Sequence, residues 1–262
     1  ATAFCGDGVV TFAPDPGTHT FQVKRFGFET ATQVANVAQG LNKWDEVGNA
    51  AKRATELSPK SGAGWNLLGY ASLNLHKHAG AVAAFRKYVE MAPNEPNAHD
   101  SLADAFLADD QLDRAAAAYQ KALDSSGGKF WWSWDGLAAV KAVRGDFEGA
   151  RAALAKQREA AIQLADKLHA DRLTAWAFVA EGKLPEALKV ADASEVAASA
   201  ARLDAQVARA QILRGQLYLA GGKYDQAFQA FTSAKLLNID ALTDGQKKLH
   251  RANALAGLAE AA

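Results

Sequence analysis

Two histidines separated by a single residue are the most suggestive chemical groups in this chain. His76 and His78 form a His-x-His pair within the segment HKHAG, where a turn is expected. Two imidazoles can ligate a metal ion, but a zinc site needs three or four protein ligands, and no cysteine or nearby acid completes this set. We therefore interpret the pair as exposed turn residues and predict no metal site.

Other catalytic arrangements are not supported by the sequence. Cys5, the only cysteine, has no histidine at a spacing typical of a nucleophile, and the six histidines are scattered along the chain. No glycine-rich loop follows a strand and opens a helix, so no phosphate cradle is indicated. The acidic pair Asp109–Asp110 falls in an expected turn, where it serves solvation and capping. The sequence predicts a non-enzyme without a cofactor.

The overall charge disfavours two classes of partner. The 29 lysines and arginines balance the 29 aspartates and glutamates, and there is no basic run. Proteins that bind nucleic acid or anionic membrane surfaces carry basic patches. No apolar run is long enough for a transmembrane helix. We therefore expect no nucleic-acid partner and no transmembrane segment.

Residues 130–134, FWWSW, suggest binding rather than catalysis. They hold three of the six tryptophans of the chain. Exposed apolar clusters mark interaction surfaces, whereas buried ones fill a core. The choice depends on where each ring points, and therefore on the elements that carry the rings.

Those elements follow from an internal repeat. Pro59 and Pro93 occupy the same place in two similar segments, ELSPKSGAGW and EMAPNEPNAH. A small residue recurs at positions 47, 81, 115, 150, 187 and 227, in steps of 34, 34, 35, 37 and 40. Each half of a repeat shows the apolar spacing of an amphipathic helix, and segments such as ADDQ and AGGK read as turns between the halves. One helical pair cannot bury its apolar face alone, so the repeats must stack.

Segments WNLLGYASL, AVAAFRKYVEMAP and RGQLYLAGGKYDQAFQAFTSA resemble the tetratricopeptide repeat family. The resemblance covers about residues 28–242. It implies an all-α, superhelical solenoid of about six helix–turn–helix repeats. The drift of the period predicts longer second helices in repeats four and five, or insertions at their ends.

The two ends of the chain differ from the repeats. Residues 28–262 are predicted to form one repeat domain, closed by a capping helix over about residues 244–261. Residues 1–27 form a separate arm, in which GVVTFA and THTFQVKRF lie on either side of PDPG. These two β-like runs predict a short hairpin, with a loosely ordered leader as the alternative.

The resemblance also implies a binding surface, because in that family the first helix of each pair lines a concave groove. Carried over onto this chain, the groove positions give the predicted binding residues, which are Tyr70, Trp132, Asp135, Val143, His169, Arg172, Trp176, Val179, Ile212 and Leu219. Trp132 and Trp176 are the predicted anchors. Trp134 takes the large position that Trp65 takes two repeats earlier, so it is predicted to be core, with Trp131 near the same face and Trp132 pointing elsewhere.

The predicted groove changes character along the chain. Its N-terminal half is polar and acidic, with Asn66, Asn97, Asp100 and Asp104, and it lacks the lysine of a carboxylate clamp. Its C-terminal half is apolar apart from His169 and Arg172. Within the resemblance, the first hypothesis is a scaffold that holds a peptide or protein partner. The alternative is a carrier of a small apolar ligand, such as a lipid, in a cavity enclosed by the C-terminal repeats. A third reading is self-assembly through the terminal segment LHRANALAGLAEAA.

The start of the chain bears on its location. It begins at Ala1, and its only methionine is Met91. The small-residue start is compatible with removal of a signal peptide or with trimming of the sequence. We expect an exported, periplasmic protein of a bacterium, with a cytoplasmic location as the alternative.

Overall fold

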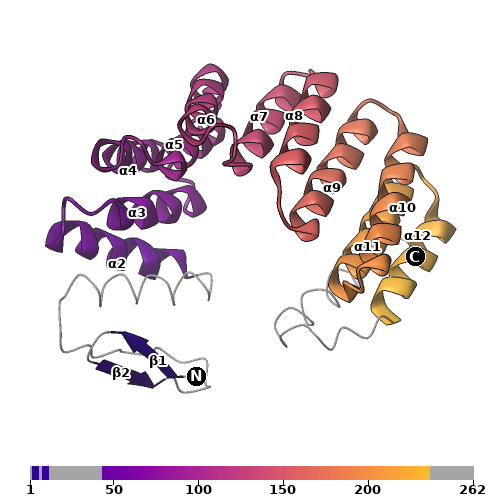
Figure 1. Cartoon of the computed structure of the whole chain (residues 1–262), viewed down its shortest axis with the longest axis horizontal. Coiled ribbons are helices and arrows are strands. Elements are labelled where there is room, and N and C mark those ends of the chain that lie inside the picture. The colour runs from indigo at the N-terminus through magenta and orange to yellow at the C-terminus, as the bar shows by residue number, and fades with distance from the viewer. Residues whose placement is uncertain (1, 6–7, 12–42, 237–262) are drawn as a thin grey trace. The chain divides into compact units, whose positions relative to one another are not determined.

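The computed structural model describes residues 2–5, 8–11 and 43–236 (Figure 1). The chain divides into two units, Ala1–Phe130 (unit 1) and Trp131–Ala262 (unit 2). The boundary lies inside FWWSW, so all three tryptophans of that segment belong to unit 2. The predicted repeat domain, residues 28–262, spans both units. The predicted capping helix over residues 244–261 lies outside the described residues.

Unit 1 begins with a two-stranded antiparallel hairpin. Strand β1 (Thr2–Cys5) pairs with β2 (Gly8–Thr11), with Thr2 opposite Thr11 and Cys5 opposite Gly8. Strand β2 coincides with the start of the predicted run GVVTFA, but its partner is the preceding segment TAFC. Only two residues separate the strands, which is the commonest hairpin connection. The other predicted run, THTFQVKRF, lies outside the described residues.

The rest of the described chain is helical. Unit 1 contains α2 (Trp44–Leu57), α3 (Gly62–Asn74), α4 (His78–Met91), α5 (Pro96–Ala108) and α6 (Leu112–Ser126). Unit 2 contains α7 (Trp132–Val143), α8 (Phe147–Ala160), α9 (Leu164–Ala180), α10 (Leu184–Ala200), α11 (Asp204–Ala220) and α12 (Tyr224–Leu236). Within each unit a helix packs mainly on its neighbours in sequence, and the contacts α3–α5 and α9–α11 join the first helices of consecutive pairs. This nearest-neighbour packing confirms the predicted helical solenoid. None of the described helices has the length and apolarity needed to cross a bilayer.

The repeating small residues lie at the centre of this packing. They are Val47, Ala81, Ala115, Ala150, Ala187 and Ala227, and each is at most 1% exposed. Each is the fourth residue of α2, α4, α6, α8, α10 or α12, so the six positions are structurally equivalent. A small side chain there lets the two helices of a pair approach closely. Four residues later, the large rings of Phe85, Tyr119 and Phe231 are buried against the neighbouring helices.

The turns inside the five complete pairs share one backbone feature. The residue two positions before each second helix has a positive φ, and these residues are His76, Asp110, Gly145, Gly182 and Gly222. The first member of the His-x-His pair therefore occupies a left-handed turn position that glycine fills in later repeats. The rings of His76 and His78 have centroids 6.3 Å apart. Among the described residues, no three His, Cys, Asp or Glu side chains converge as a metal site would require.

The lengthening of the period has a different origin from the predicted one. Helix α10, the second helix of repeat five, has 17 residues, as predicted, but α8 of repeat four has only 14. The other long helices are first helices, because α9 and α11 also have 17 residues whereas α3 and α5 have 13. The expectation of a longer second helix is therefore wrong for repeat four.

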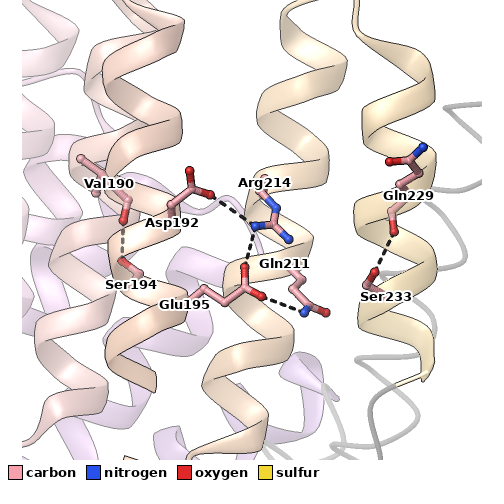
Figure 2. Close-up of polar contacts among 8 residues, drawn as sticks. All are labelled: Val190, Asp192, Ser194, Glu195, Gln211, Arg214, Gln229 and Ser233. Carbon is pink, nitrogen blue, oxygen red and sulfur yellow. Dashed lines mark hydrogen bonds and ion pairs between the residues drawn. The ribbon is translucent and has the colours of Figure 1, made fainter. Parts of the chain in front are cut away.

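Helices α10 and α11 are also joined by charged side chains (Figure 2). Nη1 of Arg214 lies 2.8 Å from Oε2 of Glu195 and 3.3 Å from Oδ1 of Asp192. Nε2 of Gln211 donates to the other oxygen of Glu195 at 2.9 Å. Both oxygens of Glu195 are therefore engaged across the repeat junction.

Candidate binding site

Unit 2 brings predicted binding residues from successive first helices together. Asp135 lies on α7, and His169 and Arg172 lie one turn apart on α9. Nε2 of His169 is 2.9 Å from Oδ2 of Asp135, although the two residues are 34 positions apart in sequence. Repeat stacking therefore creates this contact.

The hydrogen bonds of His169 define its protonation. Nη2 of Arg172 lies 2.8 Å from Nδ1 of His169. A guanidinium can only donate, so Nδ1 must accept, and the ring proton must sit on Nε2, which donates to Asp135. His169 is thus a neutral imidazole between a carboxylate and a guanidinium. Both of its ring nitrogens are occupied.

A small cavity lies beside Arg172, between α9, α10 and α11. Its volume is about 60 Å³, and its lining consists of Ala165, Leu168, His169, Arg172, Ser194, Gln206, Arg209, Ala210 and Leu213. Burial lowers the pKa of the Arg172 guanidinium, and the nearby charge of Arg209 lowers it further, while Asp135 acts in the opposite direction. The half-buried Arg172 and the exposed Arg209 therefore line the same cavity.

A second, apolar cavity lies between α7, α8 and α9. It measures about 210 Å³, and the residues around it are Asp135, Ala138, Ala139, Ala142, Phe147, Ala150, Leu154, Leu173, Trp176, Ala177 and Ala180. Asp135 is the only charged member of this lining. Trp176, a predicted anchor, is 37% exposed and forms part of the wall. The cavity suits one aliphatic or aromatic side chain.

The tryptophans of FWWSW take three different roles. Trp132 is 51% exposed and stacks on Trp131, with ring centroids 3.7 Å apart. Its ring also stands edge-on to His169 at 6.4 Å. Trp134 packs against the core cluster of Ala138, Ala150, Ala153 and Leu154, as predicted, and Nζ of Lys156 lies 5.4 Å from its ring centroid. The prediction that Trp131 and Trp132 point apart is wrong, since Trp131 precedes α7 and its ring covers that of Trp132.

Tyr70, the predicted site residue of unit 1, is tied into the interior. Its hydroxyl lies 3.0 Å from Oγ of Ser101, and its ring packs edge-on against Phe85. Burial, first of all, raises the pKa of the Tyr70 phenol. The acidic residues expected in this half of the groove are also engaged or buried, because Asp104 accepts from the Tyr119 hydroxyl at 2.6 Å and Asp100 is buried.

The remaining predicted residues are spread over unit 2. Val143 is exposed at the end of α7, whereas Val179 packs against the cluster around Leu213 and Leu217. Ile212 is only 8% exposed and belongs to the cluster around Phe231, on which Leu219 also packs. Ile212 therefore offers little surface to a partner, whereas Val179 and Leu219 are partly exposed.

The predicted binding residues leave out Arg209, Gln206 and Ser194, which line the smaller cavity. Arg209 carries a usable signal, because it precedes Ala227 by the same interval at which His169 precedes Ala187. Ser194 lies on a second helix, and Gln206 lies one turn before Arg209 on α11. Neither follows from a rule that considers only the groove positions of first helices.

Comparisons with known proteins agree with the repeat architecture. The family model described as "Tetratricopeptide repeat" matches residues 35–96 and 188–246. No curated protein matches the chain. The resemblance to this family is confirmed.

Solved structures share the fold at low sequence identity. PilW, described as a widely conserved type IV pilus biogenesis factor, is 15% identical, with a TM-score of 0.61 over 85% of this chain and 97% of that one. PilF of Pseudomonas aeruginosa is 13% identical, with a TM-score of 0.58 over 86% and 97% of the two chains. MamA from Desulfovibrio magneticus RS-1 is also 13% identical, with a TM-score of 0.50 over 63% and 90%. At these identities the likeness shows the helical solenoid fold alone.

Proposed function

Because this chain carries tetratricopeptide repeats, we propose that it is a non-catalytic scaffold that holds a peptide or protein partner on unit 2. The surface in question is formed by α7 and α9 and extends to α11. The observation that carries the proposal is the combination of Trp132, exposed beside the Asp135–His169–Arg172 chain, with an apolar cavity walled by Trp176. Exposed tryptophans beside an apolar recess are typical of binding hot spots.

The chemistry of His169 supports binding rather than catalysis. An Asp–His pair can act as a general base when one ring nitrogen is free to take a proton from a substrate. Here Arg172 occupies Nδ1 and Asp135 occupies Nε2. The imidazole therefore serves as a rigid polar element of the surface, fixed by both neighbours.

The sizes of the two cavities lined by described residues of unit 2 favour the scaffold over a lipid carrier. They measure about 60 and 210 Å³, whereas small-molecule sites span roughly 300–1,000 Å³. The larger cavity accommodates one side chain of a partner. The carrier remains the second candidate, supported by the apolar lining of this cavity. Native mass spectrometry of the purified protein, with organic extraction, tests it: a co-purifying lipid would favour the carrier.

The role and the cellular location of such a scaffold are further parts of the proposal. PilW is described as a biogenesis factor, which agrees with a role in assembly. We keep an exported, periplasmic location in a bacterium as part of the proposal, with the cytoplasm as the alternative. Fractionation of the native host with an antibody against the chain distinguishes the two.

The test of the scaffold is selection from a random peptide library displayed on phage. We expect the full chain to enrich peptides, and we expect Trp132→Ala and Trp176→Ala each to weaken their binding by about 2 kcal/mol or more, roughly 30-fold in Kd. Phe228→Ala is the matched control, because Phe228 is 48% exposed on α12 and lines neither cavity. Circular dichroism melts establish that each variant is folded. Peptide affinities unchanged by both tryptophan substitutions would show that the site is misplaced.

A further inference from the structure

The cationic cavity of unit 2 has a repeat-equivalent whose charges are matched. Asp135 precedes the buried Ala150 by the same interval at which Arg172 precedes the buried Ala187. His169 and Arg209 are likewise equivalent, because they precede Ala187 and Ala227 by one common interval. The pair Asp135–His169 and the pair Arg172–Arg209 therefore occupy the same slot in consecutive repeats.

The contents of the two slots differ in charge. In the first slot a carboxylate accepts a hydrogen bond from an imidazole at 2.9 Å. In the second slot two arginines line the same cavity, and burial, followed by the positive charge of Arg209, lowers the pKa of Arg172. Like charges in one slot are destabilising unless an anion lies between them. The second slot therefore has the electrostatics of a site that is completed by a negative group.

No acidic residue of the described structure supplies that group. The nine residues around the cavity include no aspartate or glutamate. Among the described residues, neither Arg172 nor Arg209 has a carboxylate within 4.0 Å. Arg172 bonds instead to the neutral imidazole of His169.

Two acids that stand next to lining residues in sequence are already paired. Glu195 follows Ser194 but turns to Arg214 and Gln211 (Figure 2). Asp171 precedes Arg172 but pairs with Arg158 at 2.8 Å. Within residues 43–236, the two arginines are thus left without a carboxylate partner.

We propose that this cavity binds the carboxylate of an aspartate or glutamate side chain in an acidic partner segment. The cavity of about 60 Å³ has room for a group of that size. Arg172 and Arg209 donate charge-assisted hydrogen bonds to it. An apolar side chain of the same segment occupies the neighbouring cavity walled by Trp176. This inference rests on the proposed scaffold function and specifies the chemistry of its partner.

The experiment compares peptide selections by the full chain and by Arg172→Gln/Arg209→Gln. We expect the unmodified chain to enrich peptides that combine Asp or Glu with a large apolar residue, and the double variant to lose the acidic preference. Replacing the acid of a selected peptide by its amide should weaken binding at least about tenfold. The control Arg53→Gln/Lys189→Gln removes the same net charge outside the cavity and should keep the preference.

The single variant Arg209→Gln is the control for misfolding of the double variant. Arg209 is exposed on α11, and its replacement leaves the Arg172–His169 hydrogen bond intact. It should retain the fold and still weaken binding of the acidic peptide. Peptides enriched without an acidic preference would overturn the inference and leave the scaffold standing. Enrichment of no peptide at all would overturn both. Inorganic phosphate that binds the chain and is displaced by no acidic peptide would identify a site for a free anion and also overturn the inference.

Discussion

Replacing Gly69 by alanine tests the packing that holds each helix pair together. Gly69 lies on α3, where an added Cβ would stand 2.4 Å from Cε1 of Phe85, and 2.5 and 2.6 Å from its Cζ and Cδ1. Ordinary contact begins near 3.4 Å, so the ring must move by about 1 Å. Phe85 is fully buried with Ala81 and Ala105 and has little freedom to move.

Two effects of opposite sign then compete in the Gly69→Ala variant. Alanine favours the helix over glycine by about 0.8–1.0 kcal/mol. Overpacking of a well-filled core costs about 1–3 kcal/mol. Because three ring atoms clash at once, we expect the packing cost to win, with a net loss of roughly 1–2 kcal/mol in the free energy of unfolding.

Gly48→Ala is the matched control. Gly48 lies inside α2, and the nearest atom to its added Cβ is that of Ala71 at 3.7 Å, an ordinary contact. This variant should gain up to about 1 kcal/mol from helix propensity alone. Urea unfolding followed by far-ultraviolet circular dichroism measures the free energy of unfolding of both variants.

A double substitution tests the mechanism. In repeat four the equivalent positions hold Ala138 and Leu154, an alanine facing a smaller side chain. The stability lost through Gly69→Ala should therefore be at least about 1 kcal/mol smaller in a Phe85→Leu background than in the parent chain. If Gly69→Ala stabilises the chain as much as Gly48→Ala does, the close approach of α3 and α4 is not what sets this position.

Three further predictions concern single positions. His76→Gly should raise stability by about 1 kcal/mol, because His76 holds a φ of 55° that glycine adopts without strain, and a lower melting temperature would contradict this. Gln157→Met should also raise stability by about 1 kcal/mol, since Gln157 is 0% exposed and its amide lacks a hydrogen-bond partner among the described residues; a loss in urea unfolding would reveal a partner. Asp146→Ala should lower stability at neutral pH. The Gly149 N–H, and then Lys141, lower the pKa of the Asp146 carboxyl, so its contribution is present above the usual aspartate range and lost as the pH falls through the folded pKa. The gap between variant and parent should close in acid, and a gap independent of pH would refute the capping role.

The helix pairs were predictable because their cause is local and repeated. A close contact between two helices requires a small residue at one fixed position, and the sequence shows it from Val47 to Ala227. The repeat register likewise predicted that Trp134 belongs to the core, and Trp134 packs on the cluster around Ala150 and Leu154. Helical spacing failed for Trp131, which lies before the first residue of α7, so its ring direction follows the turn and not the helix.

The composition of the candidate site was decided by tertiary structure. The sequence supplied Asp135, His169 and Arg172 as separate groove positions, but nothing in it indicated that Asp135 and His169 would share a hydrogen bond. Nor did it indicate that Arg172 would share a cavity with Arg209. Such neighbours come from different repeats, and the lengths of α9 and α11 set which residues face each other across the junction. Local sequence patterns determine how each helix packs against the other helix of its pair. The net charge of a cavity instead depends on side chains from different repeats, which become neighbours only when the repeats stack.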